Sequence, residues 1–149
     1  MKKVILYTDG ACSGNPGVGG WACVLMYKKH QKQFSGGEQL TTNNRMELKA
    51  VIEGLKQLKE KCNVEIYSDS AYIVNAINKD WLTQWQLRGW KTVNKDEVQN
   101  QDLWEELLTL LSKHKTTFIK VKGHSDNEYN NLCDKLAVEE VKKLKSTSN

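Results

Sequence analysis

The chain has 149 residues, of which 39% are hydrophobic and 27% are charged, and its formal net charge is +4. This length supports one compact domain with its own core, and no apolar run is long enough to cross a membrane. The four cysteines are scattered without a CxxC pair, which excludes the spacing of a zinc finger and argues against a disulfide framework.

The N-terminus begins with two lysines and a short apolar stretch, as a signal peptide does, but Asp9 ends that stretch too early. We therefore expect a cytoplasmic protein with reduced thiols. The mild positive charge permits a polyanionic partner without requiring one.

The hydrophobic pattern changes between strand and helix periods along the chain. It predicts strands at 4–10, 21–27 and 32–40, a helix from Asn44 to about Lys61, a strand at 63–69, helices at 70–78, 80–89 and 102–114, a strand at 117–123 and a helix at 129–145. The glycine-rich segment 10–20 is predicted to be a loop. Short connections favour antiparallel pairing of the first three strands. The order indicates the α/β class, with one mixed sheet covered by helices.

Four carboxylates stand at informative places in these elements. Asp9 ends the first strand, Asp69 ends the fourth, Glu47 lies on the inward face of the first helix and Asp134 lies in the last helix. If the first and fourth strands are neighbours, Asp9 and Asp69 lie side by side at the edge where α/β sheets bind ligands. Converging acids would repel one another without a cation, so the pattern predicts a site for hard divalent metals.

Each acid also has a simpler interpretation. Asp9 is followed by glycine, as in many hairpin turns. Glu47 lies three residues after Asn44, as in a capping box. Asp69 precedes a helix, where aspartate often caps the first turn, and Asp134 suits a solvated helix flank. The case for a metal site is therefore a joint one.

Several segments in the same order resemble the type 1 ribonucleases H. They are YTDGACSGNPGVGGWA at 7–22, TTNNRMEL at 41–48, IYSDSAY at 66–72 and KGHSDNEYNNLCDKLA at 122–137, with RGWKT at 88–92 and DLWEEL at 102–107. The resemblance covers nearly the whole chain. It implies a single-domain ribonuclease H-like fold, in which a five-stranded mixed sheet with its first three strands antiparallel carries helices on both faces.

The same resemblance implies an endonuclease that hydrolyses the RNA strand of RNA–DNA hybrids. The implied metal ligands are Asp9, Glu47, Asp69 and Asp134, and His124 is the implied loop histidine that assists proton transfer or product departure. The implied substrate contacts are Gly10, Asn15, Thr42, Asn43, Asn44, Trp81, Trp85, Arg88, Trp90, Lys91 and Asn100. Among these, Thr42 and Asn100 correspond to a pocket for a DNA phosphate.

The expected chemistry explains why acids and a histidine are needed. Two Mg²⁺ ions, with Mn²⁺ as a possible substitute, activate water and stabilise the leaving oxygen, and each holds only one or two carboxylates. The expected products carry 5′-phosphate and 3′-hydroxyl ends. A histidine with an ordinary pKa near 6.5 exchanges a proton near neutrality.

Four positions depart from the family pattern. Gln86 and Leu87 replace lysines of a basic protrusion, Leu40 replaces a common phosphate-pocket arginine, and Ala71 replaces a glutamine that reaches the minor groove. Because phosphate contacts supply much of the affinity for nucleic acids, we expect weaker hybrid binding than in a relative with a basic protrusion.

Two other functions remain open from the residues. One is a nuclease of the same fold that cuts duplex DNA, such as a junction resolvase, and the other is a non-catalytic nucleic-acid-binding module. We assign residues 1–145 to the catalytic domain and 146–149 to a polar tail. We expect a monomer that needs no protein partner and no membrane.

Overall fold

The computed structural model describes residues 1–122 and 127–147. Its elements, in chain order, are β1 (Lys2–Gly14), β2 (Gly17–Tyr27), β3 (His30–Thr41), α1 (Asn43–Lys56), β4 (Cys62–Ser68), α2 (Ala71–Asn78), α3 (Trp81–Leu87), α4 (Gln101–Leu111), β5 (Lys115–Lys120) and α5 (Glu128–Thr147). Within these described ranges, no helix combines the length and the apolar character of a membrane span.

One five-stranded sheet organises the molecule, with the strand order β3-β2-β1-β4-β5. β1 pairs antiparallel with β2, and β2 pairs antiparallel with β3. β4 runs parallel to both β1 and β5. The predicted mixed sheet and the predicted neighbourhood of the first and fourth strands are therefore confirmed.

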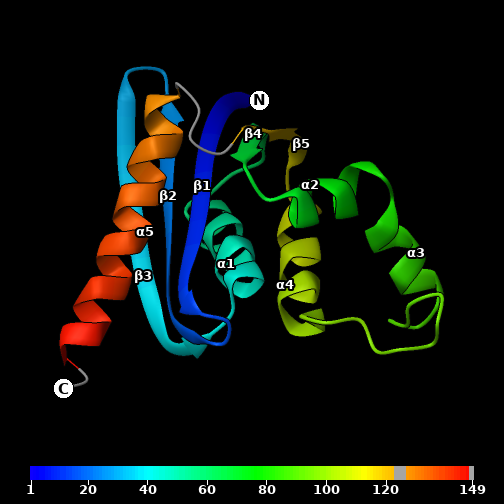
Figure 1. The fold of residues 1–149 in the computed structure, drawn as a ribbon. Coiled ribbons are helices and arrows are strands. Elements are labelled where there is room, and N and C mark those ends of the chain that lie inside the picture. The colour runs from blue at the N-terminus through cyan, green and yellow to red at the C-terminus, as the bar shows by residue number, and fades with distance from the viewer. Residues whose placement is uncertain (123–126, 148–149) are drawn as a thin grey trace.

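Helices cover both faces of the sheet, because side chains of a strand alternate between its faces. Val4 and Leu6 of β1 join the main core, which α1 and α4 complete. Ile5 and Tyr7 belong to a second cluster that contains Cys133 and Ala137 of α5. Figure 1 shows α5 alongside β1, β2 and β3, while α2 and α3 form a lobe on the other side of the molecule. Helices on both faces, as predicted, are confirmed.

The glycine-rich segment is a strand pair and not the predicted loop. The ladder between β1 and β2 runs to Gly14 and Gly17, with Gly10 opposite Trp21. The turn is confined to Asn15 and Pro16, and Gly14 adopts a φ of +86° that favours glycine. Backbone hydrogen bonds hold this ladder, so the absence of side chains does not prevent a strand.

The first helix is shorter than its apolar pattern predicts, since α1 ends at Lys56 and not near Lys61. The N–H groups of Gln57 and Leu58 bond carbonyls only three residues back, at 3.2 and 3.1 Å. Such bonds tighten a final turn. The residues that follow turn the chain back toward β4.

All four cysteines are free thiols. Cys23, Cys62 and Cys133 are buried, while Cys12 in β1 is half-buried. Burial raises the pKa of the Cys23 thiol to about 12, and it also raises the pKa of Cys133.

Candidate active site

Asp9 and Asp69 lie just beyond the ladder that joins the parallel strands β1 and β4. That ladder runs to Tyr7 and Tyr67, and each aspartate stands two residues further along the chain. Asp9 does not end its strand as predicted, because β1 continues to Gly14 in its ladder with β2. Glu47 comes from the first turns of α1. One carboxylate oxygen from each of these three acids lies within 4.8 Å of the other two. Three of the four acids that were predicted to converge are therefore brought together in the fold.

The backbone of Gly10 joins two of these acids. Its N–H donates to Oδ1 of Asp9 and to Oε1 of Glu47, both at 2.9 Å. A Cβ at Gly10 would lie 2.6 Å from the backbone nitrogen of Glu47, closer than real contacts allow. Glycine at this position therefore permits α1 to approach β1 and to bring Glu47 into the site.

Burial makes the acids hard to ionise in the absence of a cation. The exposed fractions of Asp9 and Glu47 are 4% and 3%. Burial, followed by the charges of Asp69 and Asp134, raises the pKa of Asp9 to about 7, although hydrogen bonds from Glu47 and Gly10 oppose the rise. Burial and the charge of Asp9 raise the pKa of Glu47 well above its ordinary value. Without a counter-charge, this pair favours retaining a proton near neutral pH.

Two polar atoms at the site fit a cation and its water shell. Oε2 of Glu47 and Oδ1 of Asn130 are buried, and neither has a hydrogen-bond partner in the described part of the chain. Buried oxygens normally have partners. Carboxylate and amide oxygens are ligands that hard divalent ions accept, so the donor set fits a metal such as Mg²⁺.

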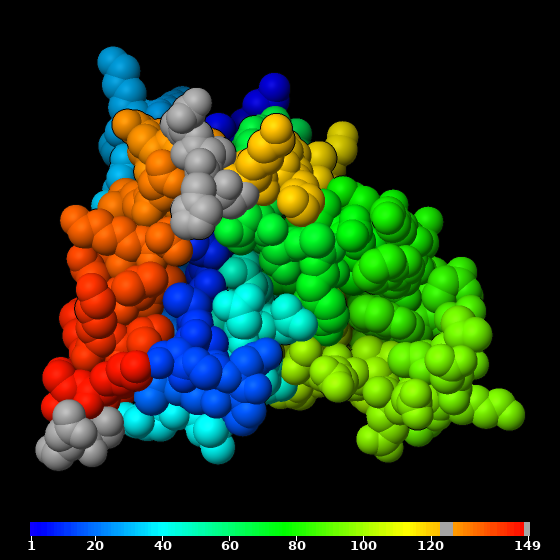
Figure 2. Space-filling model, viewed as in Figure 1, coloured from blue at the N-terminus to red at the C-terminus, as the bar shows by residue number. Residues whose placement is uncertain are grey.

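A pocket of about 380 Å³ contains the acids. Its lining residues come from several elements and are Asp9, Gly10, Asn43, Asn44, Glu47, Asp69, Ser70, Ala71, Tyr72, Asn130, Asn131 and Asp134. Asp134 is exposed and lies at this pocket, outside the tight cluster of three acids. In Figure 2 the start of α1, in cyan, lies between the blue β1–β2 turn and the green lobe of α2 and α3.

The capping alternatives to a metal site are excluded by the local structure. The cap of α1 is Thr42, whose hydroxyl accepts from the N–H of Arg45, and not Asn44. The cap of α2 is Ser70, whose hydroxyl accepts from the N–H of Ile73, and not Asp69. Asp9 lies inside a strand ladder and not in a turn. The structure therefore uses none of these three acids as a turn residue or a helix cap.

Comparison with known proteins agrees with this geometry. The family model for RNase H matches residues 1–142. A ribonuclease H of Acetivibrio thermocellus is 62% identical over 143 residues, which are 96% of this chain and 97% of that protein. A ribonuclease H of Caldicellulosiruptor saccharolyticus is 58% identical over 97% of this chain and all of that protein. The chain belongs to the ribonuclease H family.

Solved structures extend this result to the fold. The crystal structure of LC9-RNase H1, a type 1 RNase H with the type 2 active-site motif, is 29% identical, and it matches with a TM-score of 0.85 over 96% of this chain and 74% of that one. LC11-RNase H1, crystallised with an RNA/DNA hybrid, is 23% identical, and it matches with a TM-score of 0.67 over 94% and 97% of the two chains. The second likeness concerns the fold alone.

Two of the asparagines predicted to contact substrate border the acidic pocket, and a third holds them in place. Asn43 and Asn44 line it, and Asn15 in the β1–β2 turn accepts a hydrogen bond from the N–H of Asn43 at 3.2 Å. Asn15 therefore holds the start of α1 through its carbonyl oxygen, which leaves its amide hydrogens directed elsewhere. The turn and the helix start form one polar wall beside the acids.

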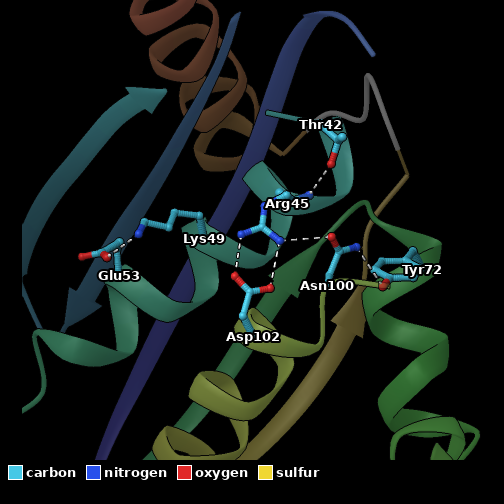
Figure 3. A network of polar contacts seen from close by, with 7 residues as sticks. All are labelled: Thr42, Arg45, Lys49, Glu53, Tyr72, Asn100 and Asp102. Carbon is cyan, nitrogen blue, oxygen red and sulfur yellow. Dashed lines mark hydrogen bonds and ion pairs between the residues drawn. The ribbon is translucent and has the colours of Figure 1, made fainter. Parts of the chain in front are cut away.

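Thr42 and Asn100 are brought together through Arg45, as Figure 3 shows. Arg45 donates its backbone N–H to Thr42 at 3.2 Å and its guanidinium to Oδ1 of Asn100 at 3.3 Å. Sequence reasoning found both outer residues but missed Arg45. It also missed Asn130 and Tyr72, which line the acidic pocket.

The predicted protrusion presents two of its aromatics on one surface. Trp81, Trp85 and Arg88 line a shallow depression of α3. Trp81 is 39% exposed, whereas the Trp85 ring meets the buried ring of Trp104 edge-on, with centroids 5.7 Å apart. Trp85 therefore joins the protrusion to the core while keeping one side open.

Trp90 and Lys91 are placed differently from Trp81. Trp90 packs against the main core, and its backbone bonds both Trp85 and Val98. The Lys91 ammonium lies 3.6 Å from the carboxylate of Glu97. His124, the expected proton-transfer residue, lies outside the described residues.

Proposed function

We propose that this chain is an endonuclease that hydrolyses the RNA strand of RNA–DNA hybrids with divalent metal ions. The single observation that carries the proposal is the gathering of Asp9, Glu47 and Asp69 within 4.8 Å, in a chain that the family model for RNase H matches along residues 1–142. A non-catalytic binding module would not need buried acids at this energetic cost.

The residues proposed to hold the metal are Asp9, Glu47, Asp69 and Asp134. Bound ions would supply a water of lowered pKa and neutralise the developing charge on the leaving oxygen. We propose two Mg²⁺ ions in the presence of substrate, with Mn²⁺ as a possible substitute, and products with 5′-phosphate and 3′-hydroxyl ends. Gly10 would help to orient such ions, because its N–H fixes one oxygen on each of Asp9 and Glu47.

Selection for RNA requires contact with the 2′-hydroxyl, which an A-like duplex exposes in its wide minor groove. The polar wall of Gly10, Asn15, Asn43 and Asn44 stands beside the acids. Asparagine both donates and accepts, as a 2′-hydroxyl does. We propose that these residues contact the minor groove next to the scissile bond.

The DNA strand is proposed to follow the other side of the pocket. Thr42 and Asn100 would bind one of its phosphates, and the protrusion would contact it through stacking and cationic groups. The residues proposed for that contact are Trp81, Trp85, Arg88, Trp90 and Lys91. His124 is proposed to assist proton transfer or product departure.

Several coarser properties complete the proposal. The catalytic domain comprises residues 1–145, and the chain acts in the cytoplasm as a monomer without an obligate protein partner.

The test is digestion of a labelled RNA–DNA hybrid with Mg²⁺, with product lengths and end groups analysed. Matched single-stranded RNA, duplex RNA and duplex DNA serve as controls. We expect cleavage of the RNA strand of the hybrid alone and loss of cleavage on chelation. Cleavage of duplex DNA at a comparable rate would favour a resolvase-like activity instead.

A further inference from the structure

Arg45 connects the two residues proposed to bind a DNA phosphate. Its backbone N–H donates to Oγ1 of Thr42, and its guanidinium donates to Oδ1 of Asn100. Thr42 ends the loop before α1, whereas Asn100 precedes α4. Arg45 is thus the link that sets these distant segments relative to each other (Figure 3).

The direction of the hydrogen bonds fixes the orientation of the Asn100 amide. Arginine only donates, so the atom of Asn100 that faces Arg45 at 3.3 Å must be the carbonyl oxygen. On the other side, Nδ2 of Asn100 donates to the hydroxyl of Tyr72 at 3.2 Å. That hydroxyl also accepts from the buried indole of Trp104 at 2.8 Å, so it is well placed as an acceptor.

The same argument applies to Thr42. Its oxygen accepts the N–H of Arg45 as the cap of α1, and its hydroxyl proton has no acceptor among the residues that the structure describes. Asn100 likewise keeps one N–H that Tyr72 does not take, because a carboxamide has two. Both residues therefore offer donors, while their acceptors are occupied by Arg45.

Asp102 holds Arg45 in this position. Its two oxygens accept from the two terminal nitrogens of the guanidinium at 2.9 and 2.7 Å. Such a forked pair fixes the plane of the guanidinium. Arg45 also holds the pKa of the Asp102 carboxyl below its ordinary value. The guanidinium is thereby committed to Asp102 and Asn100 and is not free to leave for a ligand.

We propose that Arg45 and Asp102 are positioning residues, which orient the Asn100 amide so that its remaining N–H, together with the Thr42 hydroxyl, binds a phosphate of the DNA strand. This inference rests on the proposed function. A phosphodiester carries acceptors and no donors, so a pocket that offers only donors matches it. Because Leu40 is 74% exposed and uncharged, the orientation of these neutral donors matters more here than beside an arginine.

The Arg45–Asp102 pair gives a test in which a positioning role and simple charge repulsion predict opposite changes in hybrid affinity. Asp102→Asn removes a negative charge near a polyanion, so electrostatics alone predicts tighter binding of the hybrid. If Asp102 positions Asn100 through Arg45, the change loosens the amide and weakens binding instead. The Arg45–Asp102 ion pair is partly open to solvent, with side chains 31% and 64% exposed. Such a pair contributes little to stability, and we expect the variant to fold.

The experiment measures KM and kcat on an RNA–DNA hybrid, and hybrid affinity by fluorescence anisotropy without metal. For Asp102→Asn we expect KM and Kd to rise about 3- to 10-fold, as for one weakened charge-assisted hydrogen bond, with kcat within about twofold. Asp96→Asn is the matched control, because it removes an exposed acid from the segment just before α4, and Asp96 has no contact with Arg45. It should leave KM unchanged or lower it.

A double-mutant cycle separates positioning from a general structural effect. In an Asn100→Ala background, Asp102→Asn should no longer weaken binding, because the oriented group is gone. Tighter binding of Asp102→Asn in both backgrounds would overturn the proposal and identify Arg45 as a phosphate ligand that Asp102 masks.

Failure of the proposed function is distinguishable from failure of this inference. If the parent cuts the hybrid but Asn100→Ala leaves KM unchanged, the positioning role is refuted while the proposed nuclease activity is retained. A parent that neither cuts nor binds the hybrid overturns both.

Discussion

Asp9 and Glu47 share one backbone donor, the N–H of Gly10, which lies 2.9 Å from an oxygen of each carboxylate. One donor cannot compensate two buried charges. The second oxygen of Glu47 has no partner within the described residues. The two carboxylates therefore raise the free energy of the folded state until a cation binds them. The same pair thus affects metal-dependent catalysis and the dependence of stability on pH.

Replacement of Asp9 by asparagine should abolish metal-dependent cleavage. The change removes a charged ligand at the centre of the cluster, so we expect kcat/KM on the hybrid to fall at least about 100-fold, more than the 10- to 100-fold typical of residues that only orient ligands. Initial rates in saturating Mg²⁺ measure it. Asp96→Asn is the control and should cut at the parental rate; parental activity in Asp9→Asn would refute the metal mechanism.

The stability of the metal-free protein should fall as the pH rises from about 4 to about 8. The folded-state pKa of Asp9, about 7, lies above its ordinary value of 3.8. The folded state therefore binds more protons than the unfolded state in this window, so raising the pH favours unfolding. We expect Tm in EDTA to drop by about 5 °C or more, measured by circular dichroism in a buffer series.

Two measurements check the origin of that dependence. Mg²⁺ at pH 8 should raise Tm, because it binds the folded state only. Asp9→Asn should be more stable than the parent in EDTA at pH 8 and should flatten the profile. If Tm of Asp9→Asn varies with pH as it does in the parent, titratable groups other than Asp9 cause the pH dependence of stability.

Alanine at Gly10 should destabilise the fold. The new Cβ would lie 2.6 Å from the backbone nitrogen of Glu47 and from the carbonyl carbon of Met46, and backbone atoms cannot rotate away. We expect a loss of about 2 kcal/mol or more in urea denaturation, with reduced activity. Gly89→Asn is a suitable control, since Gly89 has a φ of +64° with open space around it and asparagine tolerates that conformation.

A lysine at position 87 should strengthen substrate binding. Leu87 is 76% exposed at the end of α3, on the lobe that carries Trp81 and Arg88. One additional phosphate contact should lower KM about threefold at 0.1 M salt, and the gain should shrink as salt rises. Leu87→Gln controls for loss of the apolar side chain. An unchanged or higher KM for Leu87→Lys would place the DNA strand elsewhere.

The convergence of the acids was predictable from sequence because it depends on strand order and alternation alone. Once β1 and β4 are parallel neighbours, Asp9 and Asp69 lie side by side just beyond the ladder that joins the two strands. The position of Glu47 was equally predictable from sequence, because this residue shares the inward face of α1 with Ala50 and Val51. Such features follow from periodicity, which a sequence displays directly.

Other features depend on contacts between distant segments. The hydrogen bond from Arg45 to Asn100 joins α1 to the residue that precedes α4, and no local pattern predicts it. The strand character of Gly10–Gly14 was missed because glycine usually marks loops, whereas here the backbone ladder with β2 decides the conformation. Asn130 was missed because an asparagine in a helix gives no signal until its buried, unpaired oxygen is seen.

The distribution of the cysteines has a practical consequence. Nucleophilic attack requires the thiolate, and the enclosed sulfurs of Cys23 and Cys133 hardly ionise. Cys12, beside the β1–β2 turn, is the most accessible of the four. A maleimide dye should therefore attach there first, which would place a fluorescent reporter beside the β1–β2 turn and Thr41 without any engineering of the chain.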